Sequence, residues 1–267
     1  MKAIPSLYNL KGNIAFVTGA NGNLGRVIAK TLAELGSDLI LTDNISKNLI
    51  NFSEKLKKDF HINSWVHKCN LELNKDRNNL IREIKKNHKK LDIIINNAAF
   101  VGTSDLSGWS VKFDKQSVDT WNRAIEVNLT APFHLTQGLF KMLKKTKNGR
   151  IINISSIYGN YGPDWKIYKG TKMGNPAAYA ASKGGLIQLT RWLSTTLAPD
   201  IRVNSISPGG ILRNQSKKFL NNYKAKTPLQ RMANEKDFIG VVTYLSTDMS
   251  KYTTGQNLIV DGGWGVW

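Results

Sequence analysis

Short runs of apolar residues alternate along this chain with longer stretches in which apolar residues recur at helical spacing. The runs are rich in isoleucine and valine at successive positions, which is typical of parallel strands covered on both faces. The pattern predicts strands at Ile14–Thr18, Asp38–Asp43, Ser64–His67, Leu91–Asn96, Arg150–Ser155, Arg202–Ile206 and Asn257–Val260. It predicts helices at Leu24–Leu35 and Leu49–Phe60, and further helices between the later strands.

This alternation predicts both the fold class and the domain organisation. Strands joined by right-handed helical crossovers give an α/β fold, a Rossmann-type doubly wound parallel sheet with helices on both faces. A chain of 267 residues has room for one such domain, and no repeat, low-complexity tract or linker divides it. We therefore expect a single domain over residues 1–267.

Composition limits the cellular setting. Hydrophobic residues make up 41% and charged residues 21% of the chain, an ordinary balance for a globular domain. Cys69 is the single cysteine, so no intramolecular disulfide can form, which is compatible with a reducing compartment. Residues 1–12 hold no apolar signal core, and no apolar run is long enough to cross a bilayer. We expect a cytoplasmic protein without membrane association.

The charge is unusual, because the formal net charge is +19 and the pI is near 9.9. Such a field attracts anions, including nucleic acids and phosphorylated metabolites. The basic residues are spread along predicted helix faces, however, and no zinc-ligand pattern, RNA-recognition signature or contiguous basic arm accompanies them. We expect no nucleic-acid partner. Metal-ligand spacings, a Walker-type loop and a nucleophile elbow are also absent from the sequence, so we expect no metal.

The first predicted strand leads into a glycine-rich turn, Thr18-Gly19-Ala20-Asn21-Gly22-Asn23-Leu24-Gly25. Glycines tolerate positive φ and let the backbone approach a pyrophosphate closely. The helix that follows directs its N–H groups and the positive end of its dipole at the same phosphates. The turn therefore predicts a dinucleotide site.

Asp43 stands at the carboxyl end of the second predicted strand. A carboxylate there can accept hydrogen bonds from both hydroxyls of an adenine ribose, and it would repel a 2′-phosphate. The next basic residue is Lys47, so no cation follows it directly. The sequence predicts NAD as cofactor, in preference to NADP. The alternative is a strand-end or N-cap carboxylate without a role in binding.

Tyr179 and Lys183 lie four residues apart in an apolar helical stretch, Ala177 to Leu197, and so share one helix face. A free tyrosine, with a pKa of about 10, is a poor acid or base at neutral pH. A nearby ammonium group would favour the phenolate and lower that pKa. The pair alone is common by chance and could be no more than part of an amphipathic helix.

Other motifs accompany the pair in a fixed order along the chain. They are Asn96-Asn97-Ala98-Ala99, Glu126-Val127-Asn128-Leu129, Asn153-Ile154-Ser155-Ser156, Pro208-Gly209-Gly210 and Val260-Asp261-Gly262-Gly263. With them, the chain resembles the short-chain dehydrogenase/reductase family from about Leu10 to its C-terminus. The resemblance implies an oxidoreductase that transfers a hydride between NAD(H) and a secondary alcohol or ketone.

The resemblance also implies a role for each matching residue. Tyr179 would exchange a proton with the substrate oxygen, Ser156 would orient that oxygen, and Lys183 would hold the nicotinamide ribose. Asn128 would hold a water that continues the proton relay. The implied cofactor contacts are Gly19, Asn21, Asn23, Leu24, Gly25, Asp43, Asn70, Leu71, Asn97, Ala98, Ala99, Tyr179, Lys183, Pro208, Gly209 and Ile211.

Four departures from the family pattern stand out. Asn23 replaces the middle glycine of the phosphate turn; Gly22 beside it can supply flexibility, and asparagine tolerates left-handed φ. Ala99 replaces a glycine, and Arg213 stands where a threonine often contacts the carboxamide. The segment between Ser156 and Tyr179 is longer than usual, so we expect residues 157–176 to form an extended active-site loop. The alternative is a surface or subunit-contact loop.

The substrate is the least constrained part of the prediction. The extended loop mixes aromatic and polar side chains, which suits a sugar, and residues 209–231, a lid in this family, carry several cations. Arg213 is the predicted substrate contact. The chain also looks like a bacterial branch linked to flagellin-glycan and sialic-acid-like sugar biosynthesis, so we expect a sugar phosphate or nucleotide-linked sugar.

Two other functions stay open. One is a generic 3-oxoacyl-type carbonyl reductase, and the other is a non-catalytic NAD-binding sensor that kept the fold. The resemblance further implies a homodimer or homotetramer built on helices around Asn128–Lys144 and Ala177–Leu197, with Trp264 and Trp267 as possible contacts.

Overall fold

The computed structural model describes residues 4–45, 47–101, 106–171 and 173–267. Within these ranges seven parallel strands form one sheet in the order β3-β2-β1-β4-β5-β6-β7. The strands are β1 (Ile14–Thr18), β2 (Asp38–Asp43), β3 (Ser64–Lys68), β4 (Ile93–Asn96), β5 (Gly149–Ile154), β6 (Ile201–Pro208) and β7 (Asn257–Val260).

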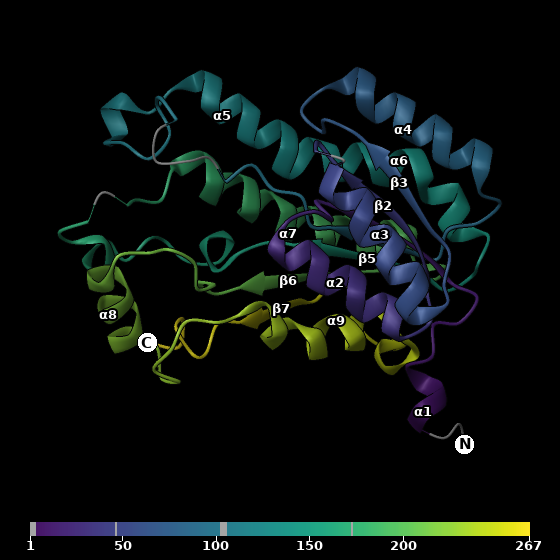
Figure 1. Cartoon of the computed structure of the whole chain (residues 1–267). Coiled ribbons are helices and arrows are strands. Elements are labelled where there is room, and N and C mark those ends of the chain that lie inside the picture. Colours follow the sequence, from purple (N-terminus) through teal and green to yellow (C-terminus); the bar gives the residue numbers. More distant parts are fainter. Residues whose placement is uncertain (1–3, 46, 102–105, 172) are drawn as a thin grey trace.

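Helices connect the strands and cover both faces of the sheet (Figure 1). They are α1 (Ile4–Leu7), α2 (Asn23–Glu34), α3 (Lys47–Phe60), α4 (Asn74–Asn87), α5 (Val118–Ile125), α6 (Ala131–Lys144), α7 (Ala177–Leu197), α8 (Lys217–Lys226) and α9 (Ile239–Ser246). A π-helical segment, Glu126–Thr130, joins α5 to α6.

Two hydrophobic cores hold the three layers together. One core packs α2, α3 and α9 against one face of the sheet, and the other packs α4, α6 and α7 against the opposite face. Strand residues supply alternate side chains to the two cores: Val17 belongs to the first, whereas Phe16 belongs to the second. Both residues are fully buried. Because both faces of the strands are covered, the strands appear in the sequence as continuous apolar runs.

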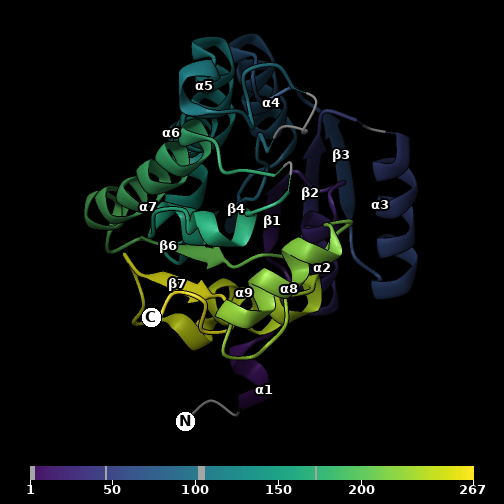
Figure 2. The same cartoon turned by 90° about the vertical axis from the view of Figure 1, so that its left-hand side faces the viewer.

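The strand order places a crevice at the carboxyl edge of the sheet. The chain runs from β1 outward to β3 and then returns to the other side of β1, where β4 pairs with it. The loops after β1 and β4 therefore leave the sheet in opposite directions, and ligands of doubly wound folds bind at such a point. Figure 2 views this edge, with α8 lying in front of it.

The predicted fold class is confirmed, and the strands lie within a few residues of their predicted ends. β4 begins at Ile93 rather than Leu91, and β6 extends to Pro208. The hydrophobic pattern predicted helices between the later strands without their bounds; of these, α5 and α8 are short and lie outside the two main cores.

Candidate active site

A cavity of about 1160 Å³ opens at the carboxyl ends of the strands. Every predicted site residue except Asn128 lines it: Gly19, Asn21, Asn23, Leu24, Gly25, Asp43, Asn70, Leu71, Asn97, Ala98, Ala99, Ser156, Tyr179, Lys183, Pro208, Gly209, Ile211 and Arg213. The structure thus brings together residues that lie far apart in the sequence.

The glycine turn is packed so closely that side chains would not fit at two positions. Gly19 has a φ of +63°, and a Cβ atom there would lie 2.7 Å from the Cα atom of Ala98. A Cβ atom on Gly25 would lie 2.1 Å from the carbonyl oxygen of Gly19. The turn therefore presents bare backbone and the first turn of α2 to the cavity, as a pyrophosphate requires.

The replacement of the middle glycine by Asn23 needs neither the flexibility of Gly22 nor a left-handed asparagine. Gly22 caps α2 with a φ of −69° and extended backbone, and Asn23 is already the first residue of the helix. Asparagine is tolerated at this position because an ordinary helical backbone needs no glycine.

Asp43 lies half-buried at the rim of the cavity beside the glycine turn. Its Oδ2 atom accepts a hydrogen bond from the backbone N–H of Asn21 at 3.0 Å. The Arg26 guanidinium donates to the carbonyl oxygen and to Oδ1 of Asn21, at 3.1 and 2.6 Å, and lies over the ring of Phe52. Arg26 thus fixes the loop that holds the carboxylate, a role that the sequence analysis missed.

Two asparagines occupy the cofactor wall in different ways. The Asn97 amide nitrogen donates to the carbonyl oxygens of Thr18 and Gly19 at 3.0 and 3.1 Å, so it ties β4 to the glycine turn. The Asn70 amide oxygen accepts the backbone N–H of Glu72 at 3.1 Å. Asn97 therefore shapes the wall, whereas a contact of Asn70 with an adenine amine stays a prediction.

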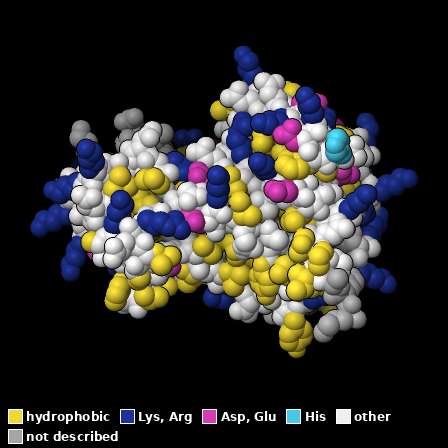
Figure 3. All heavy atoms as spheres, turned by 60° about the horizontal axis from the view of Figure 1, so that its bottom comes forward, with side chains coloured by type: hydrophobic (Ala, Val, Ile, Leu, Met, Phe, Trp, Pro, Cys, Tyr) yellow, Lys and Arg dark blue, Asp and Glu magenta, His cyan; other side chains and the backbone are white. Residues whose placement is uncertain are grey.

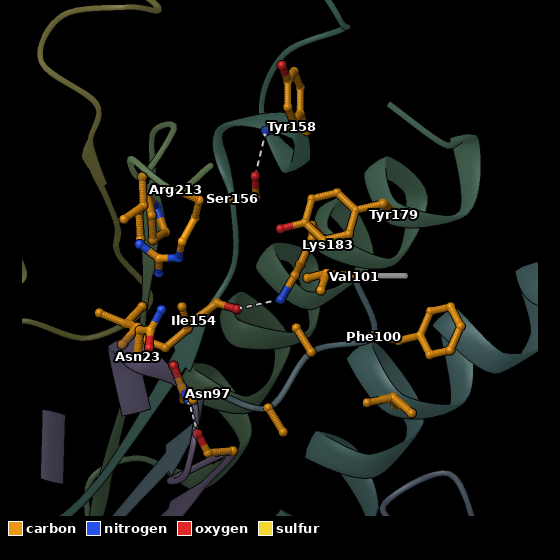
Figure 4. A pocket seen from close by; sticks show the side chains of 18 of the residues that line it. Asn23, Asn97, Phe100, Val101, Ile154, Ser156, Tyr158, Tyr179, Lys183 and Arg213 are labelled. Carbon is orange, nitrogen blue, oxygen red and sulfur yellow. Dashed lines mark hydrogen bonds between the residues drawn. The ribbon is translucent and has the colours of Figure 1, made fainter. Parts of the chain in front are cut away.

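Three polar side chains converge at the inner end of the cavity (Figure 4). The Lys183 Nζ atom lies 5.8 Å from the centre of the Tyr179 ring and donates to the carbonyl oxygen of Ile154 at 2.8 Å. The Ser156 hydroxyl accepts the backbone N–H of Tyr158 at 3.2 Å, and it lies close enough to the Tyr179 hydroxyl to influence its ionisation. A hydroxyl pair beside a buried cation can hold and exchange a proton with a substrate oxygen.

The expected net acidification of the phenol by Lys183 is wrong for the chain alone. Burial raises the pKa of Tyr179, and the neighbouring Ser156 side chain opposes this only in part. Burial also lowers the pKa of Lys183 to about 8. The hydrogen bond of its ammonium group goes to the Ile154 carbonyl, not to the phenol. Desolvation thus disfavours the charged form of both groups.

Asn128 lies in the π-helical segment and is fully buried. Its Oδ1 atom accepts the backbone N–H of Phe100 at 2.6 Å, and its Nδ2 atom donates to the Ser182 hydroxyl at 3.0 Å. The side chain therefore joins the loop after β4 to α7, next to Lys183. It does not line the cavity, so its part in a proton relay stays a prediction.

Comparison with known proteins gives the family. A family model described as enoyl-(acyl carrier protein) reductase matches residues 19–265. The post-translational flagellin modification protein A of Campylobacter coli is 30% identical over 259 residues, which cover 96% of this chain and 100% of the relative. The 3-oxoacyl-[acyl-carrier-protein] reductase of Rickettsia typhi is 34% identical over 264 residues, covering 96% and 98%. The chain belongs to the short-chain dehydrogenase/reductase family.

Solved structures agree with this assignment. A short chain dehydrogenase from Leptospira borgpetersenii with bound NAD⁺ has a TM-score of 0.83 at 31% identity, covering 99% of this chain and 96% of that one. The NADPH-dependent 3-quinuclidinone reductase from Rhodotorula rubra has a TM-score of 0.88 at 25% identity, covering 100% and 96%. This short-chain dehydrogenase/reductase is therefore an oxidoreductase of alcohol and carbonyl groups.

The long loop of this dehydrogenase/reductase lies against the predicted lid. The Tyr158 and Tyr168 hydroxyls hydrogen-bond each other, and Tyr168 packs on Phe219 of α8. An ion pair of 2.7 Å joins Asp164 of the loop to Lys226 at the end of α8. The loop and α8 are thus joined to each other beside the cavity, and their roles as active-site loop and lid stay predictions.

Two predicted contacts have other partners within the chain. Trp264 is 2% exposed and packs beside Tyr158 and Tyr223, so the expectation that it meets another subunit is wrong. Arg213 lines the cavity, but its guanidinium pairs with Glu235 at 2.6 Å. A substrate anion at Arg213 would compete with that carboxylate.

An apolar wall that no sequence motif indicated lies next to Tyr179. Trp109, which is 3% exposed, stacks edge-on against Phe100, and both pack in one cluster with Tyr179. The Trp109 indole N–H donates to the carbonyl oxygen of Val101 at 2.7 Å. This wall excludes water from one side of the phenol.

Positive charge is dispersed over one face of the molecule. On the face shown in Figure 3, Lys and Arg side chains are scattered around acidic side chains and a broad hydrophobic area rather than gathered in one patch. Within the described ranges, no three His, Cys, Asp or Glu residues come together as a metal-binding group. None of the described helices combines the length and apolar character needed to cross a bilayer.

Proposed function

We propose that this enzyme transfers a hydride between NAD(H) and a secondary alcohol or ketone on a sugar phosphate or nucleotide-linked sugar. The observation that carries the proposal is the cavity itself. It runs from a glycine turn and Asp43 at one end to Ser156, Tyr179 and Lys183 at the other. The close packing at Gly19 and Gly25 fits a dinucleotide site, because side chains there would collide with the chain itself and open the turn whose backbone faces the phosphates.

Side chains of the protein carry out the proton transfer. Nicotinamide would supply or accept the hydride when it is bound. The Tyr179 hydroxyl gives a proton to the carbonyl oxygen during reduction and takes it from the alcohol during oxidation. The Ser156 hydroxyl donates a hydrogen bond to the same oxygen and keeps it in reach of the phenol. Lys183 would hold the nicotinamide ribose, and Asn128 would keep α7 in register with the loop after β4.

We propose NAD in preference to NADP because of the Asp43 carboxylate beside the glycine turn. Asp43→Asn is expected to lower the ratio of kcat/KM for NAD⁺ to that for NADP⁺ about tenfold, or ~1.4 kcal/mol, since the charge that repels a 2′-phosphate is removed. Initial rates with both cofactors measure this ratio. Asp59→Asn, an equal charge change on the exposed side of α3, is the control and should leave the ratio unchanged. An unaltered ratio in Asp43→Asn would show that this carboxylate does not select the cofactor.

The proposed substrate class is supported by the polar and aromatic cover and by similarity to the flagellin modification protein. A specific observation favours a second candidate, because the family model and the Rickettsia relative are both named as acyl-carrier-protein reductases. The two candidate functions are separated by following NADH absorbance with three groups of substrates. These are sugar phosphates and nucleotide sugars, uncharged polyols or sugars, and 3-oxoacyl thioesters. We expect kcat/KM for the anionic sugars to exceed that for uncharged ones by about tenfold or more. Equal turnover of both would remove the argument from charge, and turnover of thioesters alone would establish the second candidate.

We also propose that the enzyme assembles as a homodimer or homotetramer. The outer surface of α5, α6 and α7 exposes three aromatic side chains, Trp121, Phe133 and Trp192. Exposed aromatic residues on neighbouring helices are typical of subunit contacts. Trp267, which is 82% exposed, stays a candidate for such a contact.

A further inference from the structure

A second hollow lies beside the active-site cavity. Its volume of about 620 Å³ falls within the range of ~300–1,000 Å³ that is usual for small-molecule sites. Ser110, Met173, Gly174 and Asn175 line both hollows, so the two share a wall. A single extended ligand can therefore occupy both, with one end beside Tyr179.

The shared wall contains an unsatisfied hydrogen-bond donor. Asn175 is 7% exposed, and its Nδ2 atom is buried without a hydrogen-bond partner among the described residues. A buried amide donor that lacks an acceptor is costly and uncommon in folded proteins. An oxygen atom of a ligand that crosses this wall would supply the missing acceptor.

Two exposed aromatic rings line the second hollow. Phe113 comes from the short helical turn Phe113–Lys115, and Trp165 from the turn Trp165–Tyr168 in the extended loop. Their exposed fractions are 84% and 60%, high values for large apolar side chains. Aromatic rings at the mouth of a hollow offer stacking surfaces for a planar ring of any base type.

The same two segments carry an excess of positive charge. Lys112 lines the hollow, and three further exposed lysines lie within four residues of the rings in the sequence. None of the four forms an ion pair with a described residue: Lys112, Lys115, Lys166 and Lys169. The acidic residues next to these rings in the sequence are Asp114 and Asp164, and Asp164 is already paired with Lys226. Arg213 in the main cavity is paired as well, with Glu235. A phosphate group is therefore better accommodated at the second hollow.

We propose that the second hollow binds the nucleoside diphosphate part of a nucleotide-linked sugar whose sugar ring reaches Ser156 and Tyr179. This inference rests on the proposed function and narrows its substrate class. The base stacks on Phe113 and Trp165, and the diphosphate lies among the lysines. The Asn175 amide donates to an oxygen at the junction between diphosphate and sugar.

Binding of uridine diphosphate, measured by calorimetry with NAD⁺ at saturation, tests the inference without turnover. Saturating NAD⁺ keeps the probe out of the dinucleotide site. The double variant Phe113→Ala/Trp165→Ala is expected to weaken binding about tenfold or more, equivalent to at least ~1.4 kcal/mol. Tyr252→Ala is the matched control, because this fully exposed aromatic residue lies near the amino end of β7 and should leave the affinity unchanged.

The result is separable from the proposed function. Tyr179→Phe should bind uridine diphosphate like the wild type while its turnover is lost, so failure of the redox chemistry would not remove the nucleotide site. No binding at millimolar concentrations of either uridine or guanosine diphosphate would overturn the inference, and so would equal affinity in the double variant. A change of oligomeric state in the double variant, seen by light scattering, would instead assign the rings to a second copy of the chain and overturn it as well.

Discussion

Tyr179→Phe is expected to lower kcat by about 10²–10⁴-fold, the usual contribution of a positioned general acid or base. The substitution keeps the ring and its packing against Phe100 and Trp109 but removes the atom that exchanges the proton. Affinity for NAD⁺ should stay close to that of the wild type, because the cofactor is held mainly by the glycine turn and Asp43. Turnover is followed by NADH absorbance, and cofactor binding by calorimetry.

A second tyrosine of the cavity provides a matched control. Tyr158 also lies beside Ser156, but its hydroxyl is hydrogen-bonded to the Tyr168 hydroxyl, and burial strongly raises the pKa of Tyr158. No lysine stands one helical turn from it, as Lys183 does from Tyr179. Tyr158→Phe should therefore reduce kcat by less than about tenfold, the loss of one supporting hydrogen bond. If Tyr158→Phe abolished turnover and Tyr179→Phe did not, the roles of the two tyrosines would have to be exchanged.

Much of the fold could be predicted because it depends on short-range patterns. Fully buried strands leave continuous apolar runs, as at Ile93–Asn96, and each is followed by the helix that covers it. The order of the elements then leaves few ways to connect a parallel sheet. The residues around the cavity follow from the same argument, because strand ends in a parallel sheet meet at one edge. Asp43 was predictable for this reason, whereas Ser156 was predicted from the family resemblance.

The electrostatic details could not be predicted, because they depend on contacts between distant segments. Arg213 pairs with Glu235 across a loop, and Trp264 at the end of the chain is covered by tyrosines from the extended loop. The sign of the pKa shift at Tyr179 depends on how deeply the phenol is buried, which follows from the packing of Trp109 and Phe100 around it. No spacing rule in the sequence reports these neighbours.

The second large effect is expected for a substitution of Gly25 in the glycine turn. Gly25→Ala places a methyl group 2.1 Å from the carbonyl oxygen of Gly19 and 2.9 Å from the amide nitrogen of Asn97. Neither atom can yield easily, because the Asn97 amide holds that same carbonyl at 3.1 Å. The turn must open, which costs about 1–3 kcal/mol for the overpacking and displaces the backbone that faces the phosphates. We expect kcat/KM for NAD⁺ to fall about 10²-fold, as an ångström-scale misplacement does elsewhere.

Gly22→Ala separates this effect from a general sensitivity of the turn to substitution. A Cβ atom on Gly22 would lie 3.4 Å from the carbonyl oxygen of Gly19, an ordinary contact, and its φ of −69° suits any residue. Its cost is limited to a poorer helix cap, about 1 kcal/mol or less. Thermal unfolding without cofactor should thus show a clearly lower midpoint for Gly25→Ala than for Gly22→Ala, by roughly 2–8 °C. NAD⁺ affinity should be lost only in Gly25→Ala. Equal behaviour of the two variants would mean that close packing at Gly25 does not shape the phosphate site, and the cofactor would then have to be held by other parts of the cavity.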